Sequence, residues 1–240
     1  MAVEPYSFEF NLFLVLTIIL LIAKLLLSFY LGFKVYSRSK EQEELKLDFM
    51  ASVLILVISL LISRILYTIF DFQLTVFNPN LYYISPNLEV WKIAGLIATL
   101  GSSTVLYVID KRILKFRFKG ILAYIFIIIS LIRFFLPINS KADFTLNSTI
   151  GSIAQLAFLI IPIVFISLGL KSPDLRKNGF LVAFGIIIYI FGSIIVSEFI
   201  LSPIREIFGD IGQILVFFIF LISKISGLTM ASYGVTKFTR

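Results

Sequence analysis

The chain contains neither cysteine nor histidine. It therefore lacks the usual ligands of haem iron, structural zinc and iron–sulfur clusters, and it has no cysteine or histidine nucleophile. The sequence also has no glycine-rich phosphate loop and no catalytic constellation of serine and aspartate. We expect a protein that is not an enzyme, with no catalytic residue, no metal and no cofactor.

Charged residues are scarce: they make up 15% of the chain, whereas 59% is hydrophobic and the mean hydropathy is +1.04. A soluble domain carries about 25% charged residues, so the excess apolar surface must face lipid. The apolar runs do not alternate with polar residues, which argues against a membrane barrel. We predict an all-α, multi-pass protein of the plasma membrane that forms one domain over residues 1–240.

Seven apolar runs are long enough to cross a bilayer when the sequence is read in a window of about 19 residues. The predicted spans cover residues 10–33, 49–70, 90–109, 120–137, 150–169, 179–202 and 211–235.

Lysine and arginine are distributed unequally between the two sides of these spans. The loops after the first, third and fifth spans and the C-terminal tail hold fourteen of the 21, whereas the N-terminus and the other loops hold three, Lys92, Lys141 and Arg205. The positive-inside rule then predicts an outer N-terminus and a cytoplasmic C-terminus. This bias accounts for the net charge of +7 without nucleic acid, and it favours contact with anionic lipid.

Ionisable residues inside the spans are costly to bury and normally face a partner or a cavity. Arg64, Arg133 and Glu198 fall at a similar depth near the outer ends of their spans, with Asp71 just beyond Arg64. We predict an outer polar network in which Arg64 pairs with Glu198 or Asp71, and Arg133 with the remaining acid. Such a network is either structural or the floor of an outward-opening site; Arg133 alone could instead snorkel to the headgroups.

Lys24 and Lys224 form a second group, deeper in the first and seventh predicted spans. No acidic residue lies in the inner half of any predicted span. The pair could hold an anionic group such as a lipid phosphate, or both side chains could snorkel to the inner surface.

Lys224 lies in the middle of the seventh predicted span, which is where microbial rhodopsins attach retinal. A retinal Schiff base needs a carboxylate counter-ion. The third predicted span has no central acid, and Asp210 is about 21 Å from Lys224 along the helix axis. The sequence therefore argues against retinal at Lys224, although it remains an alternative.

Small residues and one proline mark where helices can approach closely or bend. The predicted packing positions are Gly95, Gly101, Gly192 and Gly227, and the predicted kink is at Pro162. Asn147-Ser148-Thr149 matches a glycosylation sequon on the predicted outer side.

Two segments of the third predicted span, Glu89–Lys92 at its start and Leu106–Arg112 at its basic exit, complete a wider pattern of seven spans and short loops. The pattern resembles the seven-helix membrane sensor regions that precede histidine kinases in prokaryotes. Those sensors continue into an output domain, whereas this sequence stops at Arg240. The resemblance implies output through a separate protein that docks on the cytoplasmic loops.

We therefore expect a stand-alone membrane receptor or sensor module that signals through a cytoplasmic partner. One alternative is a non-catalytic subunit of a larger membrane complex. The other is a small transporter or channel, with its gate at the level of Arg64 and Glu198.

Overall fold

The computed structural model describes residues 5–44 and 47–238, without the side chains of Glu198, Phe199, Ser202 and Phe238. The chain is 86% helical, and the described residues contain no strand, so the predicted all-α class is confirmed. The helices are α1 (Phe8–Gln42), α2 (Phe49–Ile69), α3 (Asn87–Val108), α4 (Ile121–Phe135), α5 (Lys141–Gln155), α6 (Ile160–Lys171), α7 (Pro173–Ile195) and α8 (Glu198–Phe238).

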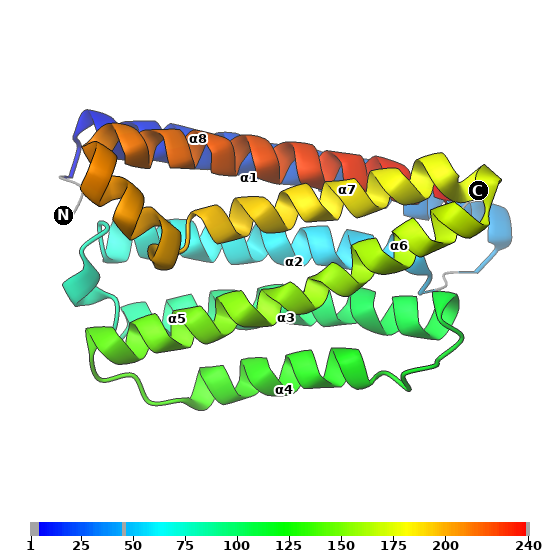
Figure 1. The fold of residues 1–240 in the computed structure, drawn as a ribbon, viewed down its shortest axis with the longest axis horizontal. Helices are drawn as coiled ribbons and strands as arrows, with labels where there is room; N and C mark the ends of the chain where they lie inside the picture. Colours follow the sequence, from blue (N-terminus) through cyan, green and yellow to red (C-terminus); the bar gives the residue numbers. More distant parts are fainter. Residues whose placement is uncertain (1–4, 45–46, 239–240) are drawn as a thin grey trace.

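The helices run side by side along the long axis of the molecule (Figure 1). Each of α1 to α4 packs on the next, α6 packs on α7, and α8 packs on both α7 and α1. The described chain begins at one end of the bundle, the N-terminal end, and α8 finishes at the opposite C-terminal end (Figure 1).

Several helices begin at a capping side chain. The hydroxyl of Ser7 accepts a hydrogen bond from the amide of Phe10, and the carboxylate of Asp48 accepts one from the amide of Ala51. The hydroxyl of Ser140 caps α5 in the same way, by accepting a hydrogen bond from the amide of Asp143. Each cap satisfies one of the amides that the first turn of a helix leaves unpaired.

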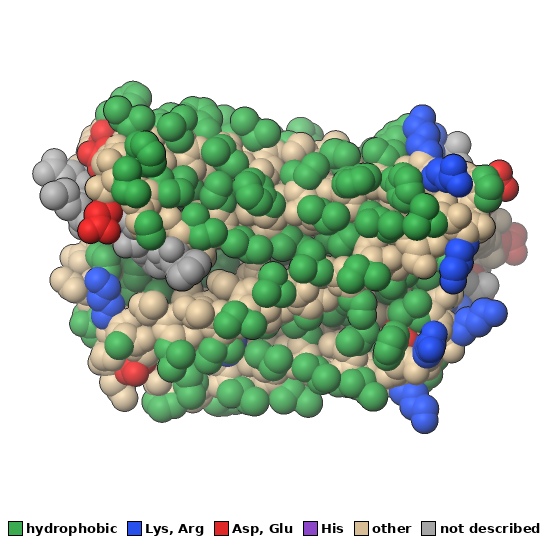
Figure 2. Space-filling view, in the orientation of Figure 1, with side chains coloured by type: hydrophobic (Ala, Val, Ile, Leu, Met, Phe, Trp, Pro, Cys, Tyr) green, Lys and Arg blue, Asp and Glu red, His purple; other side chains and the backbone are tan. Residues whose placement is uncertain are grey.

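Six helical segments are long and apolar enough to cross a membrane. Large apolar side chains on their outer faces are exposed, among them Leu26 at 63% and Phe29 at 68%, and Figure 2 shows apolar side chains over the middle of the bundle. Together these features describe a multi-pass membrane protein. The remaining predicted span corresponds to α4, which has 15 residues and is too short to count among the six.

Basic side chains gather at the C-terminal end of the bundle (Figure 2). Twelve of the fourteen predicted inner residues belong to the described chain; Lys46 and Arg240 lie outside it. The charge asymmetry read from the sequence is therefore an asymmetry between the two ends of one bundle.

The sixth predicted span ends earlier than expected. The chain leaves the helical conformation at Val196 (φ −90°, ψ 2°), so α7 stops at Ile195 and does not continue to residue 202. Residues 198–208 form a separate short helix, divided from the long part of α8 by Gly209 at φ 60° and ψ −146°. This backbone conformation is essentially restricted to glycine. We call residues 198–208 the cap segment, because they lie across the N-terminal end in Figure 1.

The fifth predicted span, residues 150–169, is the central part of a longer rod. α5 begins at Lys141 and passes through a 3₁₀ turn at Leu156–Leu159 into α6. Pro162 has no amide hydrogen to donate to the carbonyl of Phe158, so the predicted irregularity takes the form of a tightened turn just before the proline.

Glycines allow α7 and α8 to touch along their backbones. A Cβ atom on Gly227 would lie 2.6 Å from the carbonyl oxygen of Gly185, and one on Gly192 would lie 2.9 Å from Cβ of Ser223. A Cβ atom on Gly101 would similarly lie 2.5 Å from Cβ of Ser59, where α3 meets α2. Gly95 is less crowded, with the Tyr67 hydroxyl at 3.4 Å.

The packed core lies toward the C-terminal end, where Phe49 stacks on Phe165 at 5.1 Å between ring centroids. A second aromatic cluster closes the N-terminal end, with Phe13 stacked on Phe217 at 4.1 Å. Between the two lies a part of the bundle that side chains do not fill.

Candidate functional site

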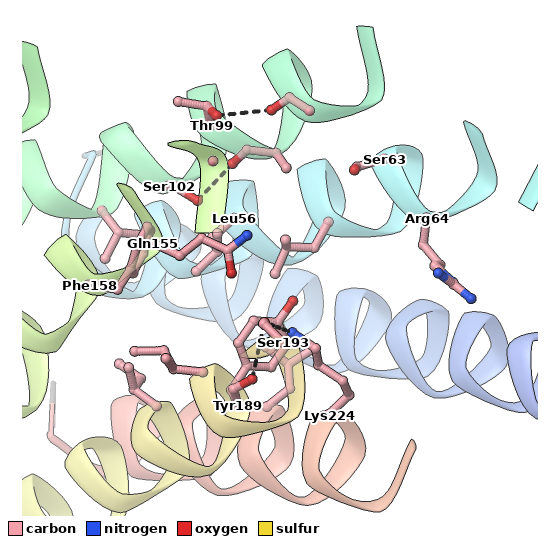
Figure 3. Close-up of a pocket in the computed structure, with 18 of the residues that line it drawn as sticks. Leu56, Ser63, Arg64, Thr99, Ser102, Gln155, Phe158, Tyr189, Ser193 and Lys224 are labelled. Carbon is pink, nitrogen blue, oxygen red and sulfur yellow. Dashed lines mark hydrogen bonds between the residues drawn. The ribbon is translucent and has the colours of Figure 1, made fainter. Parts of the chain in front are cut away.

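A cavity of about 450 Å³ occupies the middle of the bundle. Side chains from α1, α2, α3, α4, α5, α7 and α8 line it. In Figure 3, Thr99 and Ser102 of α3 face Tyr189, Ser193 and Lys224 across the space, with Leu56 and Gln155 between them. Ligand pockets usually measure about 300–1,000 Å³, so the cavity is of a size to hold a small molecule.

Four cationic side chains line this cavity: Lys24, Arg64, Arg133 and Lys224. Among the described residues, Asp71 is the one acid in the lining. The two groups predicted at different depths, the outer network and the inner pair, therefore share a single cavity. Its described lining carries three more positive than negative groups.

Lys224 is 7% exposed and projects from α8 toward α7. Its ammonium donates a hydrogen bond to the hydroxyl of Ser193 and lies 3.6 Å from the centroid of the Tyr189 ring. No described carboxylate forms an ion pair with it. The hydroxyl and the ring face stabilise the cation only in part, because both partners are neutral.

Lys24 is 4% exposed, and its ammonium donates a 2.9 Å hydrogen bond to the carbonyl oxygen of Leu60 in α2. Neither lysine therefore snorkels in this structure; each ends on a neighbouring helix inside the bundle. An ammonium has three hydrogens to donate, so among the described residues both lysines retain unused donors.

Arg64 connects α2 to α1 by a 2.9 Å hydrogen bond to the hydroxyl of Thr17. Its other terminal nitrogen lies 4.0 Å from the carboxylate of Asp71, a long ion pair. The Nε atom of Arg64 is buried and has no hydrogen-bond partner among the described residues. The predicted alternative partner, Glu198, lies outside the described side chains.

A π-helical turn at Phe70–Leu74 continues α2 and carries Asp71. This turn brings the carboxylate back toward Arg64, although the sequence places Asp71 in a loop beyond the second predicted span. Single π turns are rare and are often found at functional sites.

Arg133 is bound by a neutral residue in place of the predicted acid. Its Nε donates 3.0 Å hydrogen bonds to both the backbone and the side-chain oxygens of Asn147, and the Asn147 amide donates to the carbonyl of Arg133 at 2.9 Å. The guanidinium also lies 5.7 Å from the ring of Trp91. The guanidinium can lie against α5 at this point because Gly151, one turn after Asn147, has no side chain, and a Cβ atom there would overlap it.

Asn147 itself has no exposed surface. The sequon read at Asn147-Ser148-Thr149 is therefore inaccessible in the folded chain, because its amide is used inside the bundle.

A smaller cavity of about 200 Å³, which we call the vestibule, lies at the N-terminal end beneath the cap segment. Arg64, Asp71, Val196 and Phe220 line both spaces, so the Arg64–Asp71 pair stands where they meet. Arg205 of the cap segment lines the vestibule, and its buried Nε has no hydrogen-bond partner among the described residues.

Three polar lining residues were not predicted as site residues from the sequence: Gln155, Tyr189 and Ser193. Their signals were present as helical spacings, since Tyr189 and Ser193 are four residues apart and Ser148, Ser152 and Gln155 follow one face of α5. Polar residues at such spacings in an apolar helix indicate an inward face.

The chemistry of this lining suits an anion. Within the described residues, no three acidic side chains come close enough together to hold a metal ion. Ammonium and guanidinium groups with unused donors instead bind carboxylate or phosphate oxygens by charge-assisted hydrogen bonds. No family model, no curated protein and no solved structure matches the chain.

Proposed function

We propose that the protein is a membrane receptor that binds an anionic ligand in the central cavity and signals through its cytoplasmic loops. One observation carries the proposal: four buried or half-buried cations face a 450 Å³ space in which Asp71 is the one described acid. An uncompensated cation in a low-dielectric interior is costly, and a bound anion removes that cost.

Seven crossings agree with the path of the chain. The described residues start at one end of the bundle and finish at the other (Figure 1), which supports an odd number of crossings. Six segments are long enough to cross, so α4 supplies the seventh, and the chain that continues from Leu136 in an extended conformation adds to its reach.

The charge asymmetry supports an outer N-terminus and a cytoplasmic C-terminus. In this orientation the vestibule opens outward and the basic loops face the cytoplasm. The cavity then lies within the bilayer and adjoins the vestibule at Arg64 and Asp71.

The inner end of the cavity favours a receptor over a channel. The lining residues nearest the C-terminal end are apolar, including Phe49, Val105 and Val235. Beyond them lies the packed core around Phe165. A channel or transporter would need polar groups through this region, whereas a receptor needs only a closed pocket.

The loop after α3 offers a defined cytoplasmic surface. The buried carboxylate of Asp110 accepts hydrogen bonds from the amides of Phe118 and Gly120, at 3.0 and 2.6 Å. These bonds hold a loop that carries five basic residues between Lys111 and Lys119. A cytoplasmic partner with an acidic surface is the class that this loop fits.

The test is a ligand-dependent distance between two cytoplasmic loops. The chain has no cysteine, so spin labels attached at Lys115→Cys and Lys177→Cys report only the chosen positions. The protein in nanodiscs is titrated with inorganic phosphate, succinate and dodecyl phosphate. Binding is followed in parallel by the fluorescence of Trp91, the single tryptophan.

We expect at least one of the three anions to change both the Trp91 emission and the label distance, because a receptor has two states of different affinity. The double variant Lys24→Met/Lys224→Met should lose both responses, and the exposed-site control Lys40→Met should keep them. No response to any of the three anions would overturn the proposal. Binding without a change in distance, combined with uptake of the anion into vesicles, would make the protein a transporter.

A further inference from the structure

We infer that the ligand is an anionic amphiphile, with a carboxylate or phosphate head and a hydrocarbon tail, which reaches the cavity from the bilayer between α5 and α7. This inference rests on the proposed function and specifies the ligand of the same site. Three observations carry it: the division of the cavity into a polar and an apolar half, the convergence of unused donors in the polar half, and a side opening toward lipid.

The cavity is long, and its polarity changes along its length. Phe49 and Arg64 both line it from α2, and at 1.5 Å per residue they are about 22 Å apart along the helix. The cations lie toward the N-terminal end. The lining toward the C-terminal end is mainly apolar, with Ser102 near the depth of Leu56, and it includes Phe49, Val53, Val105, Ile161, Val182 and Val235.

This division matches the two parts of an amphiphile. A small hydrophilic anion would fill the cationic half and leave the apolar half empty. The side chains that line the apolar half would then have no van der Waals contacts on their cavity side. A hydrocarbon tail fills the apolar half, and in Figure 3 Leu56 lies between Arg64 on one side of the lining and Phe158 on the other.

Three cations present unused donors to a single head group. Arg64 and Lys224 face the same Phe220 ring, at 5.6 and 5.9 Å from its centroid. Lys24 is bound to the carbonyl of Leu60, one helical turn before Arg64 on α2. A carboxylate or phosphate accepts several hydrogen bonds at once, so its oxygens satisfy donors that the described chain leaves free.

The cavity opens sideways where α5 and α7 separate. α6 packs on α7 toward the C-terminal end, whereas α5 and α7 lie apart toward the N-terminal end (Figure 1), and the face in Figure 2 is hollowed between them. Gln155 of α5 lines the cavity and is nevertheless exposed. An opening at this depth in a membrane helix bundle faces acyl chains, so an amphiphile dissolved in the bilayer reaches the cavity without crossing water.

The experiment uses the full chain in nanodiscs of uncharged phosphatidylcholine, with Trp91 as the reporter. Trp91 lines the cavity beside Arg133, in the cationic half. One dodecanoate carries bromine beside the carboxylate and another carries it at the far end of the chain, since bromine quenches tryptophan only near contact. Competitors at equal mole fraction are dodecyl phosphate, phosphatidic acid, dodecanol and dodecyltrimethylammonium, and the tail-less competitors are succinate and inorganic phosphate.

We expect the dodecanoate with bromine beside its carboxylate to quench Trp91 and the far-end derivative not to. The anionic amphiphiles should compete at least about tenfold better than dodecanol or the cation, as expected for a lost charge-assisted contact. The better competitor of dodecyl phosphate and phosphatidic acid shows whether the ligand has one hydrocarbon chain or two.

The other outcomes separate this inference from the proposed function. If succinate or phosphate competes as well as dodecanoate, the amphiphile is wrong while an anion receptor stands. If dodecanol or the cation competes equally, or if no probe quenches Trp91 more than in Lys24→Met/Lys224→Met, both fail.

A pair of adjacent substitutions tests the position of the tail. Leu56→Phe narrows the apolar half, whereas Ile55→Phe adds the same ring on a face that is 38% exposed and outside the lining. We expect Leu56→Phe to weaken dodecanoate by about tenfold, the cost of one overpacked contact, and to leave octanoate unchanged. Equal effects of the two variants would contradict a tail in this half.

Discussion

Two of the cationic side chains in the cavity lining, Arg133 and Lys224, are bound by uncharged groups. Arg133 is fixed by the backbone and side chain of Asn147 and by the ring of Trp91. Lys224 is held by Ser193 and Tyr189. Arg133 connects α4 to α5 through its Nε, Lys224 connects α8 to α7 through Ser193, and both side chains line the cavity. Neutral partners therefore position both cations without neutralising their charge.

The contact of Arg133 with Asn147 predicts a stability effect. Asn147→Leu removes the side-chain acceptor of Arg133 Nε and the amide that donates to the Arg133 carbonyl, and leaves only the backbone acceptor. This loss should lower the free energy of unfolding by about 1–3 kcal/mol. Asn139→Leu, in the exposed loop before α5, is the control and should change it by less than about 0.5 kcal/mol. Thermal unfolding followed by Trp91 emission measures both, and equal melting temperatures would show that the pair contributes nothing.

Replacing the two buried lysines should change the free energy of unfolding in the opposite direction. Lys24→Met and Lys224→Met each replace an uncompensated buried cation by an apolar side chain of similar length, which should stabilise the ligand-free protein by about 1–4 kcal/mol. The same variants should lose anion binding. The control Lys40→Met should leave the melting temperature unchanged. A drop in melting temperature for both buried-lysine variants would mean that the lysines stabilise the fold and do not form an anion-binding site.

At the scale of helices, α7 and α8 behave as one unit. Their backbones touch at Gly185 and Gly227, and their lengths run together through the bundle. The cavity separates this pair from α2 and α3, whereas α1 and α6 connect the pair to the rest. Ligand in the cavity therefore acts between two packed halves, and we expect the α7–α8 pair to move as a rigid body.

This contact can be tested with two glycines of different surroundings. Gly227→Ala places Cβ 2.6 Å from the carbonyl oxygen of Gly185, so the helices must separate, at a cost of about 1–3 kcal/mol. Gly32 in α1 has no atom within 4 Å of such a Cβ, so Gly32→Ala should gain up to about 1 kcal/mol of helix propensity. Melting temperatures that move in the same direction in both variants would contradict the tight contact.

Sequence alone was sufficient for the helices and insufficient for the site. The predicted spans overlap the helices, because long apolar runs in a membrane have no other stable conformation, but the fifth covers α5, a 3₁₀ turn and α6, and the sixth runs past the end of α7. The end of α7 was missed because Ile194, Ile195 and Val196 continue an apolar run, and nothing local marks the turn. The sequence singled out Lys24, Arg64, Arg133 and Lys224, but their shared cavity depends on which helices are neighbours. The Asn147 partner of Arg133 was likewise invisible, since it arises from two segments meeting.

At the scale of the whole molecule, the proposed topology has a fixed orientation in the membrane, and the two ends of α4 lie on opposite sides of the bilayer. In the proposed orientation, the basic C-terminal end would face the anionic headgroups of the cytoplasmic leaflet and the vestibule would open outward. The outer surface between the ends is apolar and exposed, as lipid contact demands.

Single cysteines at Arg117 and Asn139 test this topology. A membrane-impermeant maleimide added to intact cells should label Asn139→Cys, and it should label Arg117→Cys only after permeabilisation, because α4 crosses between them. Asn80→Cys and Lys177→Cys serve as references for the outer and inner sides. Labelling of both α4 sites from the same side would show that α4 does not cross and that the bundle has fewer spans.

The most direct measurement of the central claim is native mass spectrometry of the chain released from the membranes in which it was made. We predict the 27.2 kDa chain with one retained acidic amphiphile, identified after organic extraction. The same preparation of Lys24→Met/Lys224→Met should give the bare chain. A wild-type chain that retains nothing beyond what the double variant retains would contradict the account, as would a stoichiometric second polypeptide in place of a small acid.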